Sequence, residues 1–515
     1  DYLIGINFSR LLTLKYRNSI SNYLGNKDTV VSVGRVMTCV LGMVVRRERE
    51  IREFVKTPFY RVIESVNVDG HTFTGEWRAV KGSAYFESPK LYKENGFKEK
   101  EEAKKLIAVL KEGTSPLTCR IVSIEKKKEK KNPPLLFNLA ELQNECSKRF
   151  KISPDETLRI VQELYEKKLV TYPRTDARVL STAVSKEITK NLNGLSKYQM
   201  TAPYMQDILH YGAYKNLAKT RYVNDKQITD HYAIIPTGQG LSALNSVSAT
   251  AHHVYDVIVR RFLSIFYPPA VYQKVALVTQ IGKEQFFSNF RVLAEEGYLK
   301  VAGVPAPKKN ANGNDAEGDG SDNNVDLDAA FFASIQKLKK GDILDVKSLD
   351  IKEGETSPPK RYNSGSMILA MENAGQLIED EELRAQIKGS GIGTSATRAE
   401  ILKKLFNIKY LALNKKTQVI TPTLLGEMIY DVVLNSIRSL LNPELTASWE
   451  KGLNYVAEGE ITSDEYMTKL DHFIVSRTNG VLGLNNQYQL RSCYDRAAVF
   501  YKKETKGRVL KGKKE

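Results

Sequence analysis

Two separate stretches of this chain carry the alternating pattern of β-strands, and a long helical stretch lies between them. Residues 59–124 alternate apolar and polar side chains, as in YRVIESVNV and TCRIVSI, and the alternation returns after Tyr267 in VYQKVALVTQIG. A further strand pair is predicted in residues 340–355. A period of two is typical of strands with one buried face. We therefore expect the second stretch to complete the sheet that the first begins, with the helical stretch inserted in it.

Helical periodicity surrounds the two β-type stretches. Residues 1–55 repeat apolar side chains at helical spacing, residues 135–251 read as a small helical unit, and residues 356–475 are helical again. A chain of 515 residues exceeds one ordinary core, so about three units are expected. The predicted fold class is multidomain α+β.

Polar segments punctuate this pattern. KKKEKKNPP at residues 126–134 is expected to be a solvated loop, with a dedicated binding patch as the alternative. Residues 308–328 are rich in Asn, Gly and Asp and should be disordered. The carboxylates of Asp326 and Asp328 could suggest a metal site, which we discount because Mg²⁺ needs a rigid support. Periodicity is lost beyond residue 475, where we expect a basic tail that either contacts nucleic acid or aids solubility.

The charge balance favours a polyanionic partner. The chain holds 77 Lys and Arg against 60 Asp and Glu, which gives a net charge of +17 and a pI near 9.3. Nucleic acid is the better candidate, and anionic lipid the other. No apolar run approaches the roughly 18 residues of a membrane span, so membrane insertion is not expected. Four dispersed cysteines without a C-x-x-C pair indicate neither a zinc ribbon nor a disulfide framework and fit a reducing cytoplasm.

The stretch LVTYPRTDARVL places a tyrosine beside two arginines. Residues 169–171 are predicted to form a short strand that ends at Tyr172, and Arg174 and Arg178 follow. One interpretation is packing plus surface charge. The other is that the phenol is a nucleophile, since Tyr can form covalent intermediates and a guanidinium can stabilise the anions involved. A free phenol has a pKa near 10 and needs such help at neutral pH.

Two further stretches carry weaker signals. QITDHYAIIPTG contains His231, which lies close enough in sequence to Tyr172 to share its unit, although a lone histidine is more often structural. SVGRVMT contains Gly34 before Arg35, where a glycine allows a backbone or a phosphate to approach closely. Neither stretch identifies a function alone.

In their joint order these stretches resemble the type IA DNA topoisomerases of the topoisomerase III branch. Seven blocks carry the resemblance and reach to about residue 470: DYLIGINFSRLLT (1–13), SVGRVMT (32–38) followed by VVRREREIREF (44–54), VTYPRTDARVLS (170–181), ITDHYAIIPT (228–237), SPPKRYNSGSMILAMENAG (357–375), GSGIGTSATRAEIL (389–402) and LTASWEKGLNYVAEGEI (445–461).

The resemblance implies roles for the residues in these blocks. Tyr172 would attack a DNA phosphodiester and hold the 5′ end as a phosphotyrosine, Arg174 would neutralise transition-state charge, and His231 would belong to the hydrogen-bond network around the scissile phosphate. The residues expected to contact single-stranded DNA are Ser32, Val33, Gly34, Arg35, Val36, Met37, Arg10 and Arg178.

The resemblance also implies an architecture, the toroidal body of the family. Its parts would be a helical base in 1–55 and 356–475, a β-rich arch in 56–132 and 252–355, a winged-helix-like unit with Tyr172 in 133–251, and a basic tail in 476–515. Opening at the arch would lift the tyrosine-bearing unit and let a second strand pass.

The family's Toprim domain, which binds Mg²⁺, is expected to precede Asp1, so we expect no metal site within these residues. The predicted function is ATP-independent relaxation of negative supercoils and decatenation, and the alternative is a non-catalytic single-strand-binding body. Single-stranded and negatively supercoiled DNA are the expected partners of a monomer in the cytoplasm, associated with the nucleoid. A tyrosine recombinase or relaxase ranks lower, because relaxases use a histidine cluster and the six histidines include only one adjacent pair.

Overall fold

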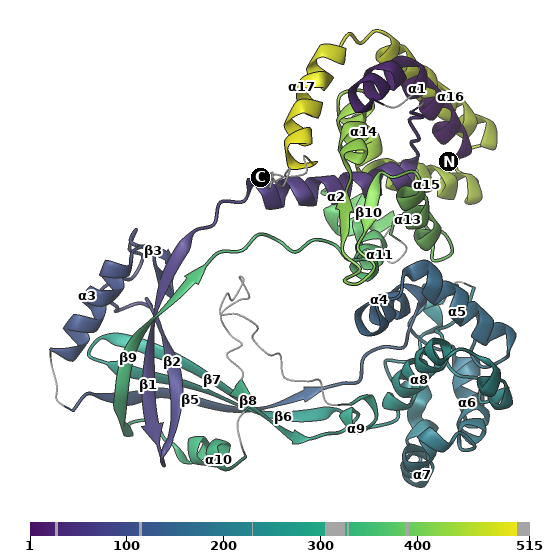
Figure 1. The fold of residues 1–515 in the computed structure, drawn as a ribbon. Helices are drawn as coiled ribbons and strands as arrows, with labels where there is room; N and C mark the ends of the chain where they lie inside the picture. The colour runs from purple at the N-terminus through teal and green to yellow at the C-terminus, as the bar shows by residue number, and fades with distance from the viewer. Residues whose placement is uncertain are drawn as a thin grey trace, which may run out of the picture.

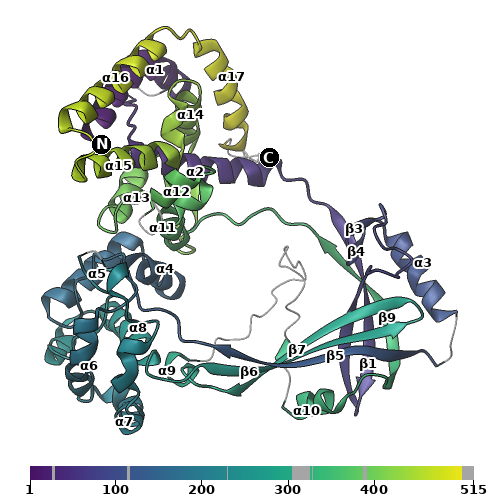
Figure 2. The same cartoon turned by 180° about the vertical axis from the view of Figure 1, so that it is seen from behind.

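The elements of the chain are arranged around a ring in the computed structural model (Figures 1 and 2). A helical base, a sheet and a second group of helices follow one another around this ring, and helix α4 of that group packs against α11 of the base. The structure describes residues 1–25, 29–112, 116–228, 230–303, 325–326, 329–386 and 391–501. Among these residues no helix is both long and apolar enough to cross a membrane. The predicted multidomain α+β class is confirmed.

The helical base is built from the two ends of the chain, and its buried apolar side chains form one core. Its helices and strands are α1 (Tyr2–Leu24), α2 (Arg35–Glu53), α11 (Ser364–Glu372), α12 (Glu381–Gln386), α13 (Arg398–Asn407), β10 (Leu411–Leu413), β11 (Ile420–Pro422), α14 (Leu424–Leu434), α15 (Pro443–Ala457), α16 (Ser463–Leu482) and α17 (Gln487–Ala498).

The expected loss of regular structure beyond residue 475 is wrong as far as Ala498. Helix α16 crosses that position, and α17 follows it with Leu490 and Tyr494 buried in the core of the base. Tyr494 meets Tyr23 of α1 edge to face, with ring centroids 5.4 Å apart. Such aromatic contacts add to the burial of apolar area, so α17 is part of the base.

The sheet combines strands from both β-type stretches. Its strands are β1 (Pro58–Val68), β2 (His71–Arg78), β3 (Leu91–Lys93), β4 (Gly96–Phe97), β5 (Thr118–Lys131), β6 (Ala270–Ile281), β7 (Glu284–Glu295), β8 (Val325–Asp326) and β9 (Ile343–Glu355). Strand β5 lies between β6 and β9, and a β1–β2 pairing closes the path into a barrel. Helices α3 (Lys100–Lys111) and α10 (Ala329–Lys337) pack on it. The strand pair expected in 340–355 is instead the single strand β9.

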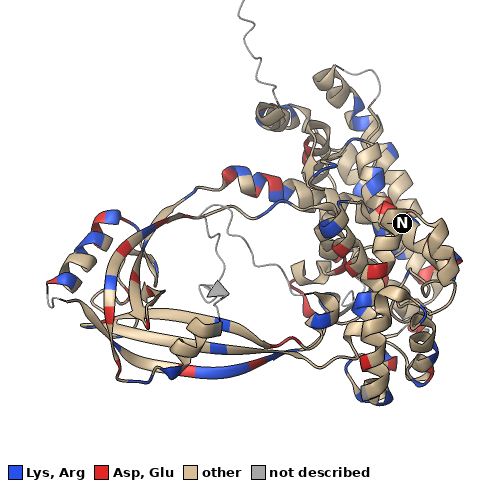
Figure 3. Cartoon of the chain, turned by 60° about the horizontal axis from the view of Figure 1, so that its bottom comes forward, with Lys and Arg blue, Asp and Glu red and all other residues tan. Residues whose placement is uncertain are grey.

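The lysine run at 126–131 belongs to strand β5, so the loop expected there is wrong (Figure 3). The backbone of Lys126 pairs with Val275, and the ladder to β6 continues to Lys131 opposite Ala270. Ladder hydrogen bonds to β6 pair the backbone groups on one edge of the run, while its side chains remain exposed. The charge pattern therefore reported solvent exposure correctly and backbone conformation incorrectly.

The remaining helices form the group that carries Tyr172, here named the tyrosine unit. They are α4 (Leu139–Phe150), α5 (Pro154–Glu166), α6 (Thr182–Leu195), α7 (Ala202–Tyr211), α8 (Ala249–Ser264) and the short α9 (Leu299–Ala302), which packs on α8. The expected boundary at residues 251 and 252 falls inside α8, whose apolar side chains share one core with α4 to α7.

The strand expected at 169–171 is a single β-bridge, between Val170 and Pro236. The pairing does not extend into a ladder, because the amide of Leu169 donates to the carbonyl of Leu164 and the amide of Ile235 donates to the Thr171 hydroxyl. In the described residues of 133–251, isolated bridges take the place of wing strands.

Only two residues of the expected disordered segment 308–328 are described. Val325 and Asp326 form β8, whose backbone pairs in parallel with β7, so the expectation does not hold there. The rest of the segment, including Asp328 of the discounted metal pair, lies outside the described residues.

A buried carboxylic acid lies inside the barrel. Glu64 on β1 has no exposed surface; one oxygen accepts a hydrogen bond from the Thr279 hydroxyl, and the other has no partner among the described residues. Burial raises the pKa of Glu64 from 4.5 to about 7. Because the pKa of Glu64 is higher in the folded state than in the unfolded state, the contribution of Glu64 to stability is greatest below pH 4.5. This contribution is lost as the pH rises through about 7.

We expect Glu64→Gln to stabilise the barrel at pH 8 by about 2 kcal/mol and to leave it little changed at pH 4.5. The pKa shift alone corresponds to about 3 kcal/mol, and the glutamine amide loses part of this because it also needs partners. The chain has two tryptophans, and Trp77 is the one buried in the sheet. In a Trp449→Phe background the tryptophan fluorescence therefore reports unfolding of the barrel alone. A gain that is equal at pH 4.5 and pH 8 would contradict titration of Glu64 as the cause.

Candidate tyrosine site and nucleic-acid groove

Tyr172 lies beside the histidine that the sequence suggested for the same site. The rings of Tyr172 and His231 have centroids 4.3 Å apart at a tilt of 41°. Tyr165 of α5 meets Tyr172 edge to face at 5.5 Å. Tyr172 is half-buried and His231 is exposed, so the phenol is packed on one side and open on another.

Two threonines fix the loop on either side of Tyr172. The Thr171 hydroxyl donates to the carbonyl of Ala233 at 3.1 Å and accepts from the amide of Ile235 at 3.0 Å. The Thr175 hydroxyl donates to the carbonyl of His231 at 2.9 Å. These bonds hold the histidine segment against the tyrosine segment. The sequence interpretation missed both threonines, although they flank Tyr172 in the quoted stretch.

Arg174, predicted to act beside Tyr172, and Arg10 and Arg178, predicted to contact DNA, differ in what they bind. Arg174 is exposed, and within the described residues no carboxylate or carbonyl engages its guanidinium. Arg178 instead forms an ion pair with Glu141 at 2.8 Å and donates to the carbonyl of Leu136 at 3.3 Å. Arg10 is exposed on α1 and does not line the cavity described next. Arg174 is thus the guanidinium available to a bound anion, while Arg178 fastens its own loop to α4.

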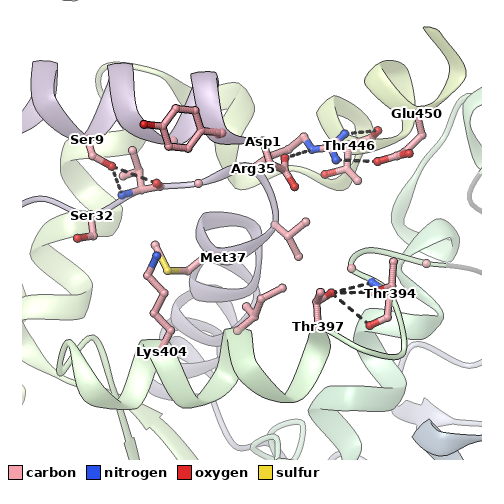
Figure 4. A pocket seen from close by; sticks show the side chains of 18 of the residues that line it. Asp1, Ser9, Ser32, Arg35, Met37, Thr394, Thr397, Lys404, Thr446 and Glu450 are labelled. Atoms are coloured by element: carbon pink, nitrogen blue, oxygen red, sulfur yellow. Dashed lines mark hydrogen bonds and ion pairs between the residues drawn. The ribbon is translucent and has the colours of Figure 1, made fainter. Parts of the chain in front are cut away.

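A cavity of about 890 Å³ lies in the base at its border with the tyrosine unit. All six residues predicted from SVGRVMT line it, from Ser32 to Met37. In Figure 4 helix α1 lies above this cavity and α13 below it. We name the cavity the groove.

An extended segment forms one wall of the groove, and hydroxyl groups of α1 hold it there. Ser9 exchanges hydrogen bonds with the backbone of Val33 at 3.0 and 3.1 Å, and Thr13 does the same with Val31 at 2.9 and 3.2 Å. Val31 and Val33 are buried, which turns Ser32 toward the groove. Ser9 and Thr13 lie one turn apart on α1, and they bond to alternate residues of the extended segment. Helix α1 therefore pairs with this segment much as a neighbouring strand would.

Tyr410 supports the same segment from the opposite side. Its hydroxyl accepts a hydrogen bond from the amide of Ser32 at 2.8 Å and donates one to the carbonyl of Val30 at 3.4 Å. Burial raises the pKa of Tyr410 to about 12, so the phenol remains protonated at neutral pH. This residue carries no signal in the sequence beyond its apolar surroundings.

The charges of the groove differ from the prediction. Arg35 is buried, and its guanidinium pairs with Asp1 at 2.7 Å and Glu450 at 2.6 Å (Figure 4). Lys404 on α13 is exposed into the groove, and among the described residues no acidic group pairs with it. Arg35 therefore ties α2 to α15, and Lys404 is the cation left for a ligand.

Lys404 was not predicted from the sequence, although its spacing could have found it. Thr397, Ile401 and Lys404 line the groove and stand at i, i+4 and i+7 on one face of α13. The block GSGIGTSATRAEIL ends just before Lys404. The tyrosine unit contributes Asp176 to the groove lining, four residues after Tyr172.

Mg²⁺ does not fit the part of the chain that the structure describes. Three His, Cys, Asp or Glu side chains that could hold a metal ion together do not occur among these residues. The acidic groups that line the groove, Asp1, Asp176 and Glu450, are each paired with an arginine.

Comparisons with known proteins agree on one family. The family model described as "DNA topoisomerase" matches residues 1–468. "DNA topoisomerase 3" of Bacillus licheniformis is 31% identical over 493 residues, covering 95% of this chain and 60% of the relative. The protein of the same name from Bacillus subtilis is 32% identical over 467 residues, covering 90% of this chain and 57% of the relative. The chain thus spans about 60% of the length of these relatives.

Among solved structures, full-length topoisomerase I from Thermotoga maritima superposes with a TM-score of 0.62. The identity is 22%, and the match covers 93% of this chain and 66% of that one. At this identity the likeness concerns the fold.

Proposed function

This chain belongs to the type IA DNA topoisomerase family, and on that premise we propose that it is the body of an enzyme that cuts, passes and reseals one strand of DNA. The observation that carries the proposal is the contact of Tyr172 with His231 in a unit that also reaches the groove through Asp176. A phenol held beside an imidazole at the edge of a groove suits attack on a phosphodiester.

In the proposed reaction the Tyr172 oxygen attacks phosphorus, and the bond from phosphorus to the 3′ oxygen breaks. The phenol loses its proton and the departing 3′ oxygen gains one, so a 5′-phosphotyrosine and a free 3′-hydroxyl result. His231 would hydrogen-bond to the reacting phosphate, and Arg174 would balance its charge, as its unpaired guanidinium allows. Resealing is the reverse reaction, and it needs no ATP because the ester retains the bond energy.

Strand passage would follow from opening of the ring. Helices α4 to α8 of the tyrosine unit meet the base through side chains and are joined to the sheet by two chain segments, so separation from the base breaks no covalent bond. We propose single-stranded and negatively supercoiled DNA as substrates and a monomer as the active form. The Mg²⁺ of the family is expected at a Toprim domain, outside the residues described above.

The test is a covalent-adduct assay. The chain is incubated with labelled single-stranded DNA and Mg²⁺, with and without a separately produced Toprim domain of a relative, and then denatured. An adduct whose labelled peptide contains Tyr172 supports the proposal. Binding without an adduct, even after the Toprim domain is added, would favour the non-catalytic single-strand-binding alternative.

Lys404→Ala is expected to weaken single-strand binding and to lower its salt dependence. A lysine that neutralises one phosphate contributes about 0.7 to the slope of log affinity against log salt for single strands. Anisotropy titrations of a labelled oligonucleotide at several salt concentrations measure this slope. Lys416→Ala serves as the control, because Lys416 is exposed in the base but does not line the groove. Equal slopes for both variants would exclude Lys404 as a phosphate contact.

A further inference from the structure

Within the part of the chain that the structure describes, four pairs of polar side chains join the tyrosine unit to the base. The pairs are Asp176 with Arg398 at 2.9 Å, Asn138 with Glu372 at 2.6 Å, Ser147 with Ser364 at 3.0 Å, and Asp155 with Lys403 at 3.2 Å.

These contacts differ in exposure: three are buried and form the centre of the interface, and one is exposed and lies at its rim. The Arg398 side chain is 1% exposed, and Asn138, Ser147 and Ser364 are buried as well. Lys403 and Asp155 are 48% and 37% exposed. A guanidinium removed from water depends on its partners, whereas an exposed pair contributes little. Loss of a central contact should therefore favour separation of the two parts more than loss of the rim pair.

Two of the three central contacts, those of Arg398 and Asn138, converge on Asp176 in the loop that follows Tyr172. The Asp176 carboxylate accepts from Arg398, and the Asp176 carbonyl accepts from the Asn138 amide at 3.1 Å. The same Asn138 amide donates to Glu372 of α11. Both the side chain and the backbone of Asp176 are thus tied to the base, one directly and the other through Asn138.

We propose that Arg398 is a positioning residue of the strand-passage cycle: by holding Asp176 it keeps the loop of Tyr172 against the groove, and its release accompanies opening of the ring. This inference rests on the proposed function. Thr175 lies between Tyr172 and Asp176 in the chain and is hydrogen-bonded to the carbonyl of His231. A displacement of Asp176 should therefore move both Tyr172 and His231. Closed and open rings then form a two-state system in which Arg398 favours the closed state.

The test measures the distance between the two parts without DNA. Spin labels are placed on the full chain at Lys186→Cys in α6 and Lys469→Cys in α16, both exposed, in a Cys493→Ser background. Arg398→Gln is expected to raise the ratio of long to short distances by about tenfold or more, the factor that about 1.4 kcal/mol produces. Arg398→Lys should restore part of the short-distance population, because it retains the positive charge.

Two further variants make the result decisive. Asp176→Asn removes the same ion pair from a side chain that is one-third exposed, so it answers the question if Arg398→Gln does not fold. Asp155→Asn removes the rim pair and is the matched control, expected to leave the distances unchanged. Wild-type distances in folded Arg398→Gln or Asp176→Asn would overturn the proposal. Because the measurement involves neither DNA nor Tyr172, its failure is distinct from failure of the adduct assay.

Discussion

Replacing Tyr172 by phenylalanine is expected to abolish the covalent adduct, by a factor on the order of 10³ or more, while single-strand affinity stays within about twofold of the unchanged chain. The substitution removes only the attacking oxygen. The ring keeps its contacts with His231 and Tyr165, so the loop should retain its position. Denaturing gels measure the adduct, and anisotropy measures binding.

Tyr165→Phe is the matched control for this experiment. Its phenol lies in the same cluster, with its ring 5.5 Å from that of Tyr172, and it is partly exposed. We expect the adduct to form at close to the normal level in this variant. Loss of the adduct in Tyr165→Phe and its persistence in Tyr172→Phe would assign the nucleophile to the other ring.

The second large effect is expected at Glu427, a buried carboxylate that joins three segments of the base. Its side chain is 1% exposed and accepts hydrogen bonds from Arg49 at 3.2 Å, Arg52 at 2.6 Å and Tyr501 at 2.6 Å. Removing one partner of a buried ion pair leaves charges unpaired in a poorly solvated place. Glu427→Ala should therefore lower the free energy of unfolding of the base by about 3 kcal/mol.

This value lies at the low end for such a network because each arginine retains another carboxylate. Arg49 still has Asp431 at 2.9 Å, and Arg52 has Glu48 at 3.4 Å. Trp449 in a Trp77→Phe background reports unfolding of the base in denaturant. Glu50→Ala is the control, since its pair with Arg47 is exposed and should contribute less than about 0.5 kcal/mol. Similar losses in both variants would contradict a special role for burial.

The fold class followed from the sequence because each pattern records how one element is buried. Alternation in 59–124 and after Tyr267 reports strands with one wet face, and the two sets do pair in one barrel. The lysine run shows the limit of this reasoning. Charge density reports that side chains are solvated, but only the partner strand β6 decides whether the backbone is paired.

The site was predictable to the extent that it lies in contiguous stretches. Tyr172 with His231, and Ser32 to Met37, each occur in one quoted block, and the structure brings the first two together and lines the groove with the others. Their chemical roles remain predictions. The pairing of Arg35 with Glu450, the support from Tyr410 and the open charge of Lys404 all depend on residues hundreds of positions away or on another face of a helix. Periodicity within one segment contains no record of such neighbours.

The chain leaves the sheet for the tyrosine unit and returns at neighbouring points. Lys131 at the end of β5 is paired with Ala270 at the start of β6, as the two strands of a hairpin are paired beside their turn. In effect, a domain has replaced a turn. Surface turns tolerate such insertions because the host strands keep their register whatever joins them. The two chain segments that leave the barrel side by side can therefore act as a double hinge. The tyrosine unit can change its orientation on this hinge while the strands of the barrel remain paired.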